Sequence, residues 1–483
     1  MLFTSLSFVI FFSVFFLLYW YIFNRSVKLQ NLLVLTGSYV FYAWWDWRFL
    51  FLLIGSSLLN YFLGIWIAKN NKAKYRTFLL WIGLLQGLGS LLAFKYFNFF
   101  VSSITNSFAA FNIHLDFYTL NLLLPLGISF YTFRTISYLL DIKNGKIEPT
   151  TDWVVFFSYV AFFPCLISGP IDRPKTFIPQ LEKKRIFDYS QASDGMRQIL
   201  WGLFKKMVIA DNCAAFTSAI FEHYKVMPAS SLLLGAFFAT IQVYADFSGY
   251  SDMAIGFSNL LGIKITRNFN APFFAQNIAG FWRRWHISLT SWLTDYVFTP
   301  LSIYFRDCGK SGLVLAILIN FTIIGIWHGA NWTFILYGFL NGCYYIPLIL
   351  NGTINKKQKL ADSQLIPPLR VVVNMAATFL LVMFTMVIFR SDNLTQAFGY
   401  YKGLFSMSIF SKPIIIEKVN TVVALIAILI MFIAEWLQRD KQHPLQIDGV
   451  KKFTLRLLIY YGLVAVILFF SANKTTDFIY FKF

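Results

Sequence analysis

The feature that most constrains the fold is a long stretch without charge. Residues 311–355 include no Asp, Glu, Lys or Arg, and most of them are Leu, Ile, Phe, Trp or Tyr. Such a stretch is long enough for two membrane-crossing helices of about 20 residues each. The composition of the whole chain also indicates a membrane protein, because 58% of its residues are hydrophobic and only 13% are charged, against about 25% charged residues in soluble domains. We therefore predict an all-α, polytopic membrane protein.

Apolar runs follow one another along the chain without a polar linker that would divide it into domains. Several runs are too short, or too often interrupted by Gly and Pro, to cross a bilayer simply. We predict one membrane domain over residues 1–483, a helical bundle with about 11 crossings plus re-entrant segments. The first run, residues 3–23, lacks the marks of a cleaved signal peptide and is expected to be a retained helix. A polar section near residues 171–198, extended by Lys205 and Lys206, is expected on the cytoplasmic membrane surface.

The excess of positive charge predicts topology. The formal net charge is +19, which in a soluble protein would suggest nucleic acid as a partner. Here the basic residues sit in short loops between apolar runs, where the positive-inside rule applies, so we expect no nucleic-acid binding. Residues 25–28 and 69–76 are basic and lie two spans apart. This spacing predicts that both loops are cytoplasmic and that the N-terminus is extracytoplasmic.

The uncharged stretch contains one histidine, His328, in the sequence IWHGANW (326–332). An imidazole is costly to bury at that depth, so it usually faces a protein interior or a water-filled cavity. Two interpretations follow from the residues alone and are equally good. His328 is either a structural residue bonded to a neighbouring carbonyl or a reactive group.

A second histidine, His286, lies in FWRRWHISL (281–289) beside Arg283 and Arg284. On a continuous helix, one face would carry His286 together with Trp282, Trp285, Leu289 and Leu293. The two arginines would fall on another face. An aromatic and cationic helix suits the membrane–water interface, and periodicity alone favours an anchor with an incidental histidine. The arginine pair could bind lipid phosphates or those of an acyl-CoA.

Several kinds of site find no support. The histidines have no carboxylate or thiolate partner at metal-binding spacing, and the four cysteines are scattered, so we expect neither a metal ion nor a disulfide framework. Neither a G-x-S-x-G motif nor a Gly-rich phosphate loop occurs. The chemistry that remains is a histidine acting as a general base on a hydroxyl or thiol, with an acyl carbonyl delivered to it. Structural burial of the histidines stays open at this point.

Charged residues interrupt apolar runs at two further places. Asp246 and Asp252 flank Gly249, which predicts a helix break and a re-entrant turn lining a cavity. Helix caps or an ion pair are an equally good explanation of the two carboxylates. Arg134 lies in an apolar run and requires either a buried partner or a lipid phosphate.

Several segments spread over most of the chain carry a combined resemblance to one family. They are PLGISFYTFRTISYLLDI (125–142), FFPCLISGPIDRP (162–174), YADFSGYSDMAIG (244–256), NFNAPFF (268–274), FWRRWHISLTSWLTDYVFTPL (281–301), IWHGANWTFILYGFLNG (326–342) and FIYFKF (478–483). Together they resemble the membrane-bound O-acyltransferase (MBOAT) family, in the bacterial branch that includes the alginate O-acetylation membrane protein. The combination is specific, although no single segment would be.

The resemblance implies a bundle with a central tunnel between cytoplasmic and outer funnels, and an essential histidine near the middle of the membrane. That histidine corresponds to His328, and the family's second histidine corresponds to His286. It also implies a multi-pass protein of the bacterial cytoplasmic (inner) membrane that moves an acetyl group from cytoplasmic acetyl-CoA toward an extracytoplasmic acceptor, commonly a polysaccharide. A secreted or periplasmic SGNH-type transferase is the expected partner. No bound cofactor is expected, because the acyl thioester is the donor substrate.

On this basis His328 is expected to deprotonate the incoming hydroxyl, with His286 positioning the donor or relaying a proton. Arg283 and Arg284 are expected near the donor phosphates, and Asn331 is a candidate for polarising the carbonyl. The remaining substrate-binding residues that we expect are Trp282, Trp285 and Trp327. Alternatives are transfer of D-alanine or acylation of a lipid within the same family, or a transporter or channel, which also buries ionisable groups.

Overall fold

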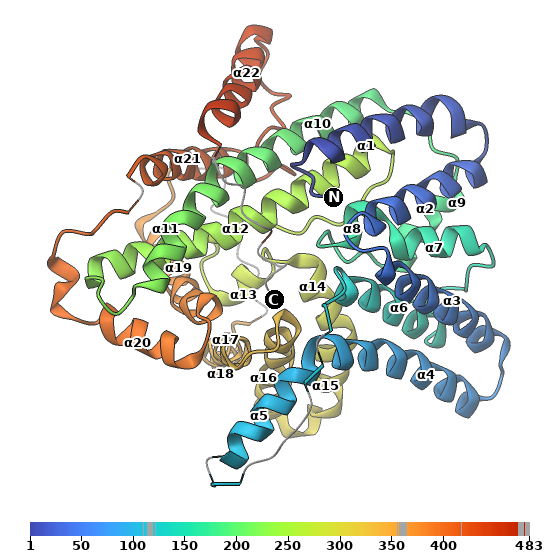
Figure 1. Ribbon diagram of the computed structural model, residues 1–483, viewed down its shortest axis with the longest axis horizontal. Coiled ribbons are helices and arrows are strands. Elements are labelled where there is room, and N and C mark those ends of the chain that lie inside the picture. Colours follow the sequence, from blue (N-terminus) through green and yellow to red (C-terminus); the bar gives the residue numbers. More distant parts are fainter. Residues whose placement is uncertain are drawn as a thin grey trace. The chain divides into compact units, whose positions relative to one another are not determined.

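The computed structural model describes residues 1–109, 111–113, 119–120, 122–354, 356, 365–416, 418–471 and 478. Within these ranges the regular structure is entirely helical (Figure 1). The all-α prediction is confirmed. The helices group into two compact units, one of residues 1–196 and 254–266 and the other of residues 197–253 and 267–483. Two of the three boundaries lie inside helices α10 (Tyr189–Leu203) and α12 (Ala229–Leu260), and the third follows α12. The single domain over residues 1–483 stays a prediction.

Nine helical stretches of the described chain are long and apolar enough to cross a membrane. They are Leu6–Arg25, Arg48–Lys69, Ala73–Ala109, Ala229–Leu260, Arg306–His328, Trp332–Leu350, Leu369–Arg390, Lys418–Leu437 and Phe453–Phe470. Other apolar runs form helices shorter than 18 residues, for example α2 (Val27–Ala43) and α6 (Ile128–Lys143). The multi-pass membrane character is confirmed, while the predicted re-entrant segments and central tunnel stay predictions.

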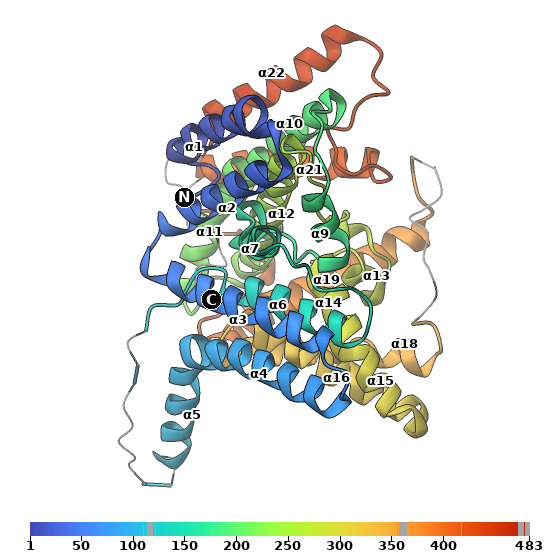
Figure 2. The same ribbon diagram turned by 90° about the vertical axis from the view of Figure 1, so that its right-hand side faces the viewer.

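The first unit is built around α6, against which α3 (Arg48–Lys69) and α4 (Ala73–Leu91) pack side by side (Figure 2). Close approach depends on glycine, because a Cβ on Gly83 of α4 would collide with Leu139 of α6. Small residues allow helices in a membrane to approach in this way. The other helices that lie wholly in this unit are α1 (Leu6–Leu17), α2 (Val27–Ala43), α5 (Phe97–Ala109), α7 (Trp153–Ala161), α8 (Phe163–Leu166) and α9 (Pro174–Glu182).

Arg134 of α6 has the buried partner that its position requires. Its side chain is fully buried, its Nη1 donates to the carbonyl oxygen of Tyr159 at 2.7 Å, and its Nη2 lies 4.0 Å from the Asp172 carboxylate. Asp172 in turn accepts from the backbone N–H and the hydroxyl of Thr266 at 2.8 and 2.6 Å. These bonds fasten the segment between α8 and α9.

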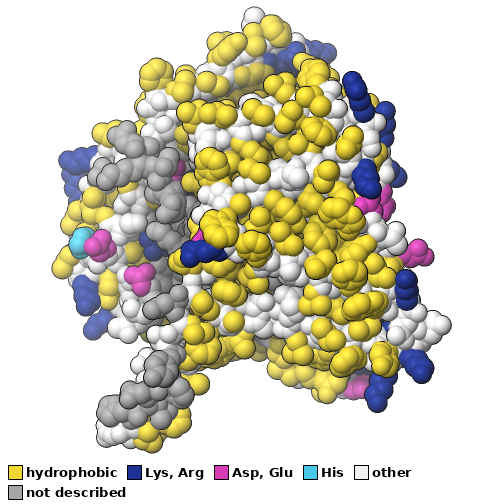
Figure 3. Space-filling model, turned by 45° about the vertical axis from the view of Figure 1, so that its right-hand side comes forward, with side chains coloured by type: hydrophobic (Ala, Val, Ile, Leu, Met, Phe, Trp, Pro, Cys, Tyr) yellow, Lys and Arg dark blue, Asp and Glu magenta, His cyan; other side chains and the backbone are white. Residues whose placement is uncertain are grey.

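The polar section near residues 171–198 is amphipathic where α9 forms. Phe177, Ile178 and Leu181 are buried, whereas Lys175 and Glu182 are exposed. Its position on a membrane surface stays a prediction. Elsewhere, large apolar side chains such as Trp66 and Phe78 are exposed on the outer sides of α3 and α4. Figure 3 likewise shows hydrophobic side chains over much of the face in view, as expected of helices that face lipid.

The second unit contains the long helix α12 and a close helical hairpin, α16 (Gly309–His328) and α17 (Trp332–Cys343). A Cβ on Gly325 of α16 would collide with the backbone of Phe334 in α17, so the hairpin packs at backbone contact. The other helices are α11 (Asp211–Glu222), α13 (Ile278–Trp282), α14 (Ile287–Leu293), α15 (Thr299–Tyr304), α18 (Ile346–Leu350), α19 (Leu369–Arg390), α20 (Leu394–Leu404), α21 (Lys418–Leu437) and α22 (Phe453–Phe470).

Gly249 does not break α12, so the predicted turn at this residue is wrong. The helix continues from Ala229 to Leu260. A Cβ on Gly249 would lie 2.8 Å from the carbonyl oxygen of Gly202 in α10, and a Cβ on Gly202 would lie 2.6 Å from that of Gly249. The two glycines therefore serve the contact between helices rather than a turn.

Candidate active site

The segment around His286 is two short helices with a break between them. α13 begins after Asn277, whose Oδ1 accepts from the N–H of Gly280 at 2.8 Å, and ends at Trp282. α14 begins after His286, whose φ of 46° and ψ of 50° lie in the left-handed region. The predicted continuous helix is wrong. The hydrophobic periodicity does not reveal the break, because Trp282 and Trp285 are buried as they would be on a continuous helix, while Arg283 between them is exposed.

His286 is completely buried in an aromatic enclosure. Its ring centroid lies 4.6 Å from that of Phe247 on α12 and 5.5 Å from that of Trp327 on α16. Its Nδ1 lies 3.2 Å from Oδ1 of Asn268. Burial, and secondarily the neighbouring His328, lowers the pKa of His286 well below 6.5. The imidazole is therefore neutral at pH 7 and able to accept a proton.

His328 is the last residue of α16 and is also buried. Its ring centroid lies 5.2 Å from Phe389 of α19 and 6.1 Å from Tyr337 of α17. Trp327 contacts both histidines, because its ring centroid also lies 5.1 Å from that of His328. The structure thus brings together two histidines that the sequence places 328 − 286 = 42 positions apart, with an indole ring against each.

Asn331 holds the turn between α16 and α17. Its Oδ1 accepts from the N–H of Thr333 at 3.1 Å, which caps α17, and its Nδ2 donates to the carbonyl oxygen of Asp392 at 2.7 Å. An N-cap of this kind contributes about 1 kcal/mol. Both polar ends of this side chain therefore make structural bonds, and its proposed contact with the acyl carbonyl stays a prediction.

The two arginines of the FWRRWH segment differ. Arg283 is exposed, and its Nη2 donates to the carbonyl oxygen of Ile354 at 2.6 Å. Arg284 is half-buried, and its enclosed Nη1 has no hydrogen-bond partner among the described residues. Burial, and secondarily the positive charge of Arg267, lowers the pKa of Arg284. The guanidinium groups of Arg284 and Arg267 are close enough to repel each other, and Nη1 of Arg284 is a donor without a hydrogen-bond partner among the described residues. Such a pair favours the binding of an anion.

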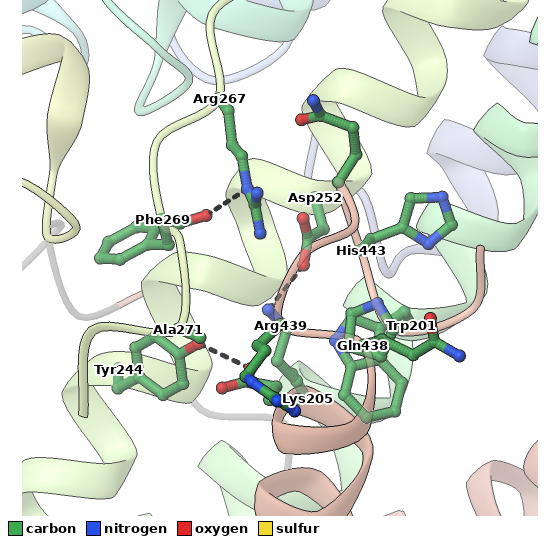
Figure 4. A pocket seen from close by; sticks show the side chains of 13 residues that line it. Trp201, Lys205, Tyr244, Asp252, Arg267, Phe269, Ala271, Gln438, Arg439 and His443 are labelled. Atoms are coloured by element: carbon green, nitrogen blue, oxygen red, sulfur yellow. Dashed lines mark hydrogen bonds and ion pairs between the residues drawn. The ribbon is translucent and has the colours of Figure 1, made fainter. Parts of the chain in front are cut away.

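Arg267 also lines a small polar pocket (Figure 4). Two further cations, Lys205 and Arg439, and two carboxylates, Asp252 and Glu435, share its wall. The other lining residues are Trp201, Tyr244, Phe269, Ala271, Gln438, Gln442, His443 and Pro444. The three cations exceed the two carboxylates by one charge, so an anionic group would neutralise the wall.

The carboxylates of α12 make ion pairs, as the alternative interpretation predicts. Asp252 lies 2.5 Å from Lys205 Nζ, and Asp246 lies 2.9 Å from Lys206 Nζ. Lys206 also lies 2.9 Å from Asp211. Both lysines are buried, so their assignment to a surface-lying basic section is wrong. They point inward because carboxylates inside the unit compensate their charge.

Sequence reasoning missed two parts of this region. The first is Asn268, a fully buried amide that faces His286. A polar residue in the otherwise apolar NFNAPFF segment was the available signal for a buried hydrogen bond. The second is Glu435 of the pocket wall, which accepts from the hydroxyl of Tyr244 at 2.6 Å. The available signal was a carboxylate at the end of an apolar run. Of the terminal FIYFKF segment, Phe478 is buried with its ring 4.9 Å from Tyr250, and residues 479–483 lie outside the described residues.

The protein is therefore an integral membrane protein whose second unit contains two buried histidines in one aromatic enclosure. Residues 147–389 match the model of the membrane-bound O-acyltransferase family. The chain belongs to this family and is a membrane-bound O-acyltransferase. Both histidines lie inside the matched residues.

Proteins similar to this chain are named for the acetylation of different polymers. The chain is 37% identical to a probable alginate O-acetylase of Azotobacter vinelandii, over 84% of this chain and 78% of that one. It is 34% identical to a probable alginate O-acetylase of Pseudomonas putida, over the full length of both chains. It is also 32% identical to a peptidoglycan O-acetyltransferase of Helicobacter pylori, over 95% of this chain and 92% of that one.

Proposed function

We propose that this O-acyltransferase moves an acetyl group from cytoplasmic acetyl-CoA toward a hydroxyl of an extracytoplasmic polysaccharide. Transfer is direct or passes through a secreted or periplasmic SGNH-type partner transferase. The observation that carries the proposal is the buried pair His286 and His328, which lies in a chain similar to two kinds of named glycan O-acetyltransferase. The protein resides in the bacterial cytoplasmic membrane with its N-terminus outside, as the basic loops at residues 25–28 and 69–76 indicate.

In the proposed reaction His328 accepts the proton of the acceptor hydroxyl, and the oxygen attacks the acetyl carbonyl. The C–O bond forms, the carbon–sulfur bond of the thioester breaks, and the proton passes to the leaving thiolate to give free CoA. A neutral imidazole suits both steps, because it accepts a proton and then returns it. General-base catalysis contributes about 10²–10⁴-fold. Alignment of the two substrates in an enclosed site contributes much of the rest.

In this proposal the protein binds acetyl-CoA at two ends, the phosphates and the acetyl group. Arg284, with its unused donor, and the neighbouring Arg267 bind a phosphate of CoA, and Arg283 contributes from the exposed side. The indoles of Trp282, Trp285 and Trp327 enclose the acyl end beside the histidines. His286 relays the proton or orients the thioester.

The experiment uses membranes that contain the protein, together with its acceptor glycan. Acetyl-CoA, a long-chain acyl-CoA and a D-alanyl carrier-protein thioester, each labelled in the acyl group, are compared as donors. Label from acetyl-CoA is expected in the glycan fraction, at a rate at least tenfold above the other two donors. Label from one of the others alone would identify a different acyl group and overturn the acetyl assignment. Flux of a solute through liposomes without acyl transfer would instead indicate a transporter.

A further inference from the structure

Asn268 makes an unusual set of bonds directly beside His286. It is fully buried in the segment between α12 and α13. Its Oδ1 accepts from the backbone N–H of Ser288 at 3.2 Å and from the Ser288 hydroxyl at 3.0 Å, and it lies 3.2 Å from Nδ1 of His286. Its Nδ2 donates to the hydroxyl of Ser251 on α12 at 3.3 Å. The amide is therefore held from both sides.

These bonds determine which atom of the amide faces His286. A backbone N–H can only donate, so the atom that it reaches must be the amide oxygen and not the nitrogen. An oxygen at hydrogen-bond distance from Nδ1 requires that Nδ1 carries the proton. In a neutral imidazole the lone pair is then on Nε2. Asn268 thus selects one of the two tautomers of His286.

The same residue also holds the backbone of His286. The N–H of Ile287 donates to the carbonyl oxygen of Asn268 at 2.9 Å, and the N–H of Asn270 donates to that of Arg284 at 2.9 Å. These two bonds span the break between α13 and α14, where His286 adopts its positive φ of 46°. A non-glycine residue in this region costs about 1–2 kcal/mol, and such conformations persist where the surroundings enforce them.

We propose that Asn268 is a positioning residue for acyl transfer, which fixes His286 as the Nδ1–H tautomer with Nε2 as its proton-accepting atom. This inference rests on the proposed function, in which His286 takes part in the reaction. Metal-bound histidines are oriented by the same kind of outer hydrogen bond, whose loss typically costs 10–100-fold in activity or affinity.

The electrostatic surroundings make a pH experiment interpretable. The titratable group that lowers the pKa of His286 is His328 of α16, after burial itself. The α12 residues against the His286 site, Phe247 and Ser251, are uncharged, while Asp246 and Asp252 of that helix are paired with Lys206 and Lys205. The α14 residue that contacts Asn268 is Ser288, which is also uncharged. A carboxylate at position 268 would therefore act on His286 as a new charge.

The decisive variant is Asn268→Asp, which keeps the shape and the acceptor oxygen but adds a negative charge. The carboxylate stabilises the protonated imidazole, so the pKa of His286 rises and the base form appears only at higher pH. The acid limb of kcat/KM for acetyl transfer is expected to move upward by about one pH unit or more, with activity largely retained on the alkaline side. Asn268→Leu, which removes the acceptor, is expected to lower kcat by about 10–100-fold at every pH.

The matched control is Asn277→Asp, the same substitution at the N-cap of α13, where Asp is as good a cap as Asn. Its acid limb is expected to match the wild type. If Asn268→Asp and Asn268→Leu lose the same factor with an unchanged pH profile, Asn268 has only a structural role and the inference is wrong. Variants are compared after size-exclusion chromatography in detergent confirms that each is folded.

A second measurement separates this inference from the proposed function. In protein labelled with ¹⁵N-histidine, His286→Gln identifies the His286 signals. Wild-type His286 is expected to show a protonated Nδ1 and an unprotonated Nε2 at pH 7, and the protonated site is expected to change in Asn268→Leu. An Nε2–H tautomer in the wild type would overturn the inference whatever the activity. The expected tautomer in a protein that transfers no acetyl group would contradict the proposed function alone.

Discussion

At the scale of single residues, the neutral state of His286 predicts a chemical role. His286→Ala is expected to lower kcat for acetyl transfer by about 10²–10⁴-fold, with the KM for acetyl-CoA changed less than threefold. The reason is that a buried neutral imidazole provides a proton acceptor that alanine lacks. His223→Ala, which removes an exposed histidine, is the control and is expected to behave as wild type. A raised KM with unchanged kcat would show instead that His286 only binds the donor.

Arg284 provides a test of how the donor is held. Arg284→Gln is expected to raise the KM for acetyl-CoA about tenfold or more, because a charge-assisted bond to a phosphate is lost. With acetyl-pantetheine, which has no phosphate, the variant and the wild type are expected to have equal KM values. Arg306→Gln, at an exposed arginine beyond α15, is the control. An equal loss with both donors would contradict phosphate binding by Arg284.

At the scale of helices, the sequence predicts most elements but not the break at His286. Apolar runs and their periodicity predict membrane-crossing helices because burial against lipid and protein requires apolar surfaces. The break between α13 and α14 depends on hydrogen bonds from residues 268–270, and no local pattern contains that information. The same lack of local information explains why the predicted turn at Gly249 is wrong. A glycine is equally suited to a turn and to a close helix contact, and only the opposing Gly202 distinguishes them.

The candidate site could be predicted only in part for the same reason. The two histidines and Trp327 stand out as polar or aromatic residues in conspicuous motifs, and the fold places them together. The pocket wall joins α10, α12, the segment after it and the end of α21. Such distant segments meet through tertiary packing. Sequence spacing therefore did not reveal Arg439 or Glu435 as neighbours of Lys205.

The buried ion pairs of α12 predict a strong effect on stability. Lys206→Met is expected to destabilise the protein by about 3–5 kcal/mol, because it leaves Asp211 and Asp246 buried without their cation. The measurement is the midpoint of thermal unfolding in detergent, which is expected to fall by several degrees. Lys183→Met, at an exposed lysine after α9, is the matched control with no expected change. An unchanged midpoint for Lys206→Met would show that the two carboxylates do not depend on this lysine.

At the scale of the whole molecule, the distribution of basic loops predicts the orientation in the membrane. In a Cys308→Ser background, which removes the exposed cysteine, Lys72→Cys is expected to react with an impermeant maleimide only after the cells are opened. Thr4→Cys is expected to react in cells with an intact cytoplasmic membrane, because the positive-inside rule places the N-terminus outside. The opposite labelling pattern would reverse the orientation and contradict a cytoplasmic phosphate-binding site at Arg267 and Arg284.

The central claim is that His328 is the base of acyl transfer, and single-turnover kinetics test it most directly. Purified protein in lipid is loaded with labelled acetyl-CoA, and transfer to the acceptor is followed for the wild type, His328→Ala and His223→Ala. His328→Ala is expected to bind acetyl-CoA with unchanged affinity and to transfer the acetyl group at least 100-fold more slowly, while His223→Ala matches the wild type. Transfer by folded His328→Ala at a rate near the wild type would contradict the account.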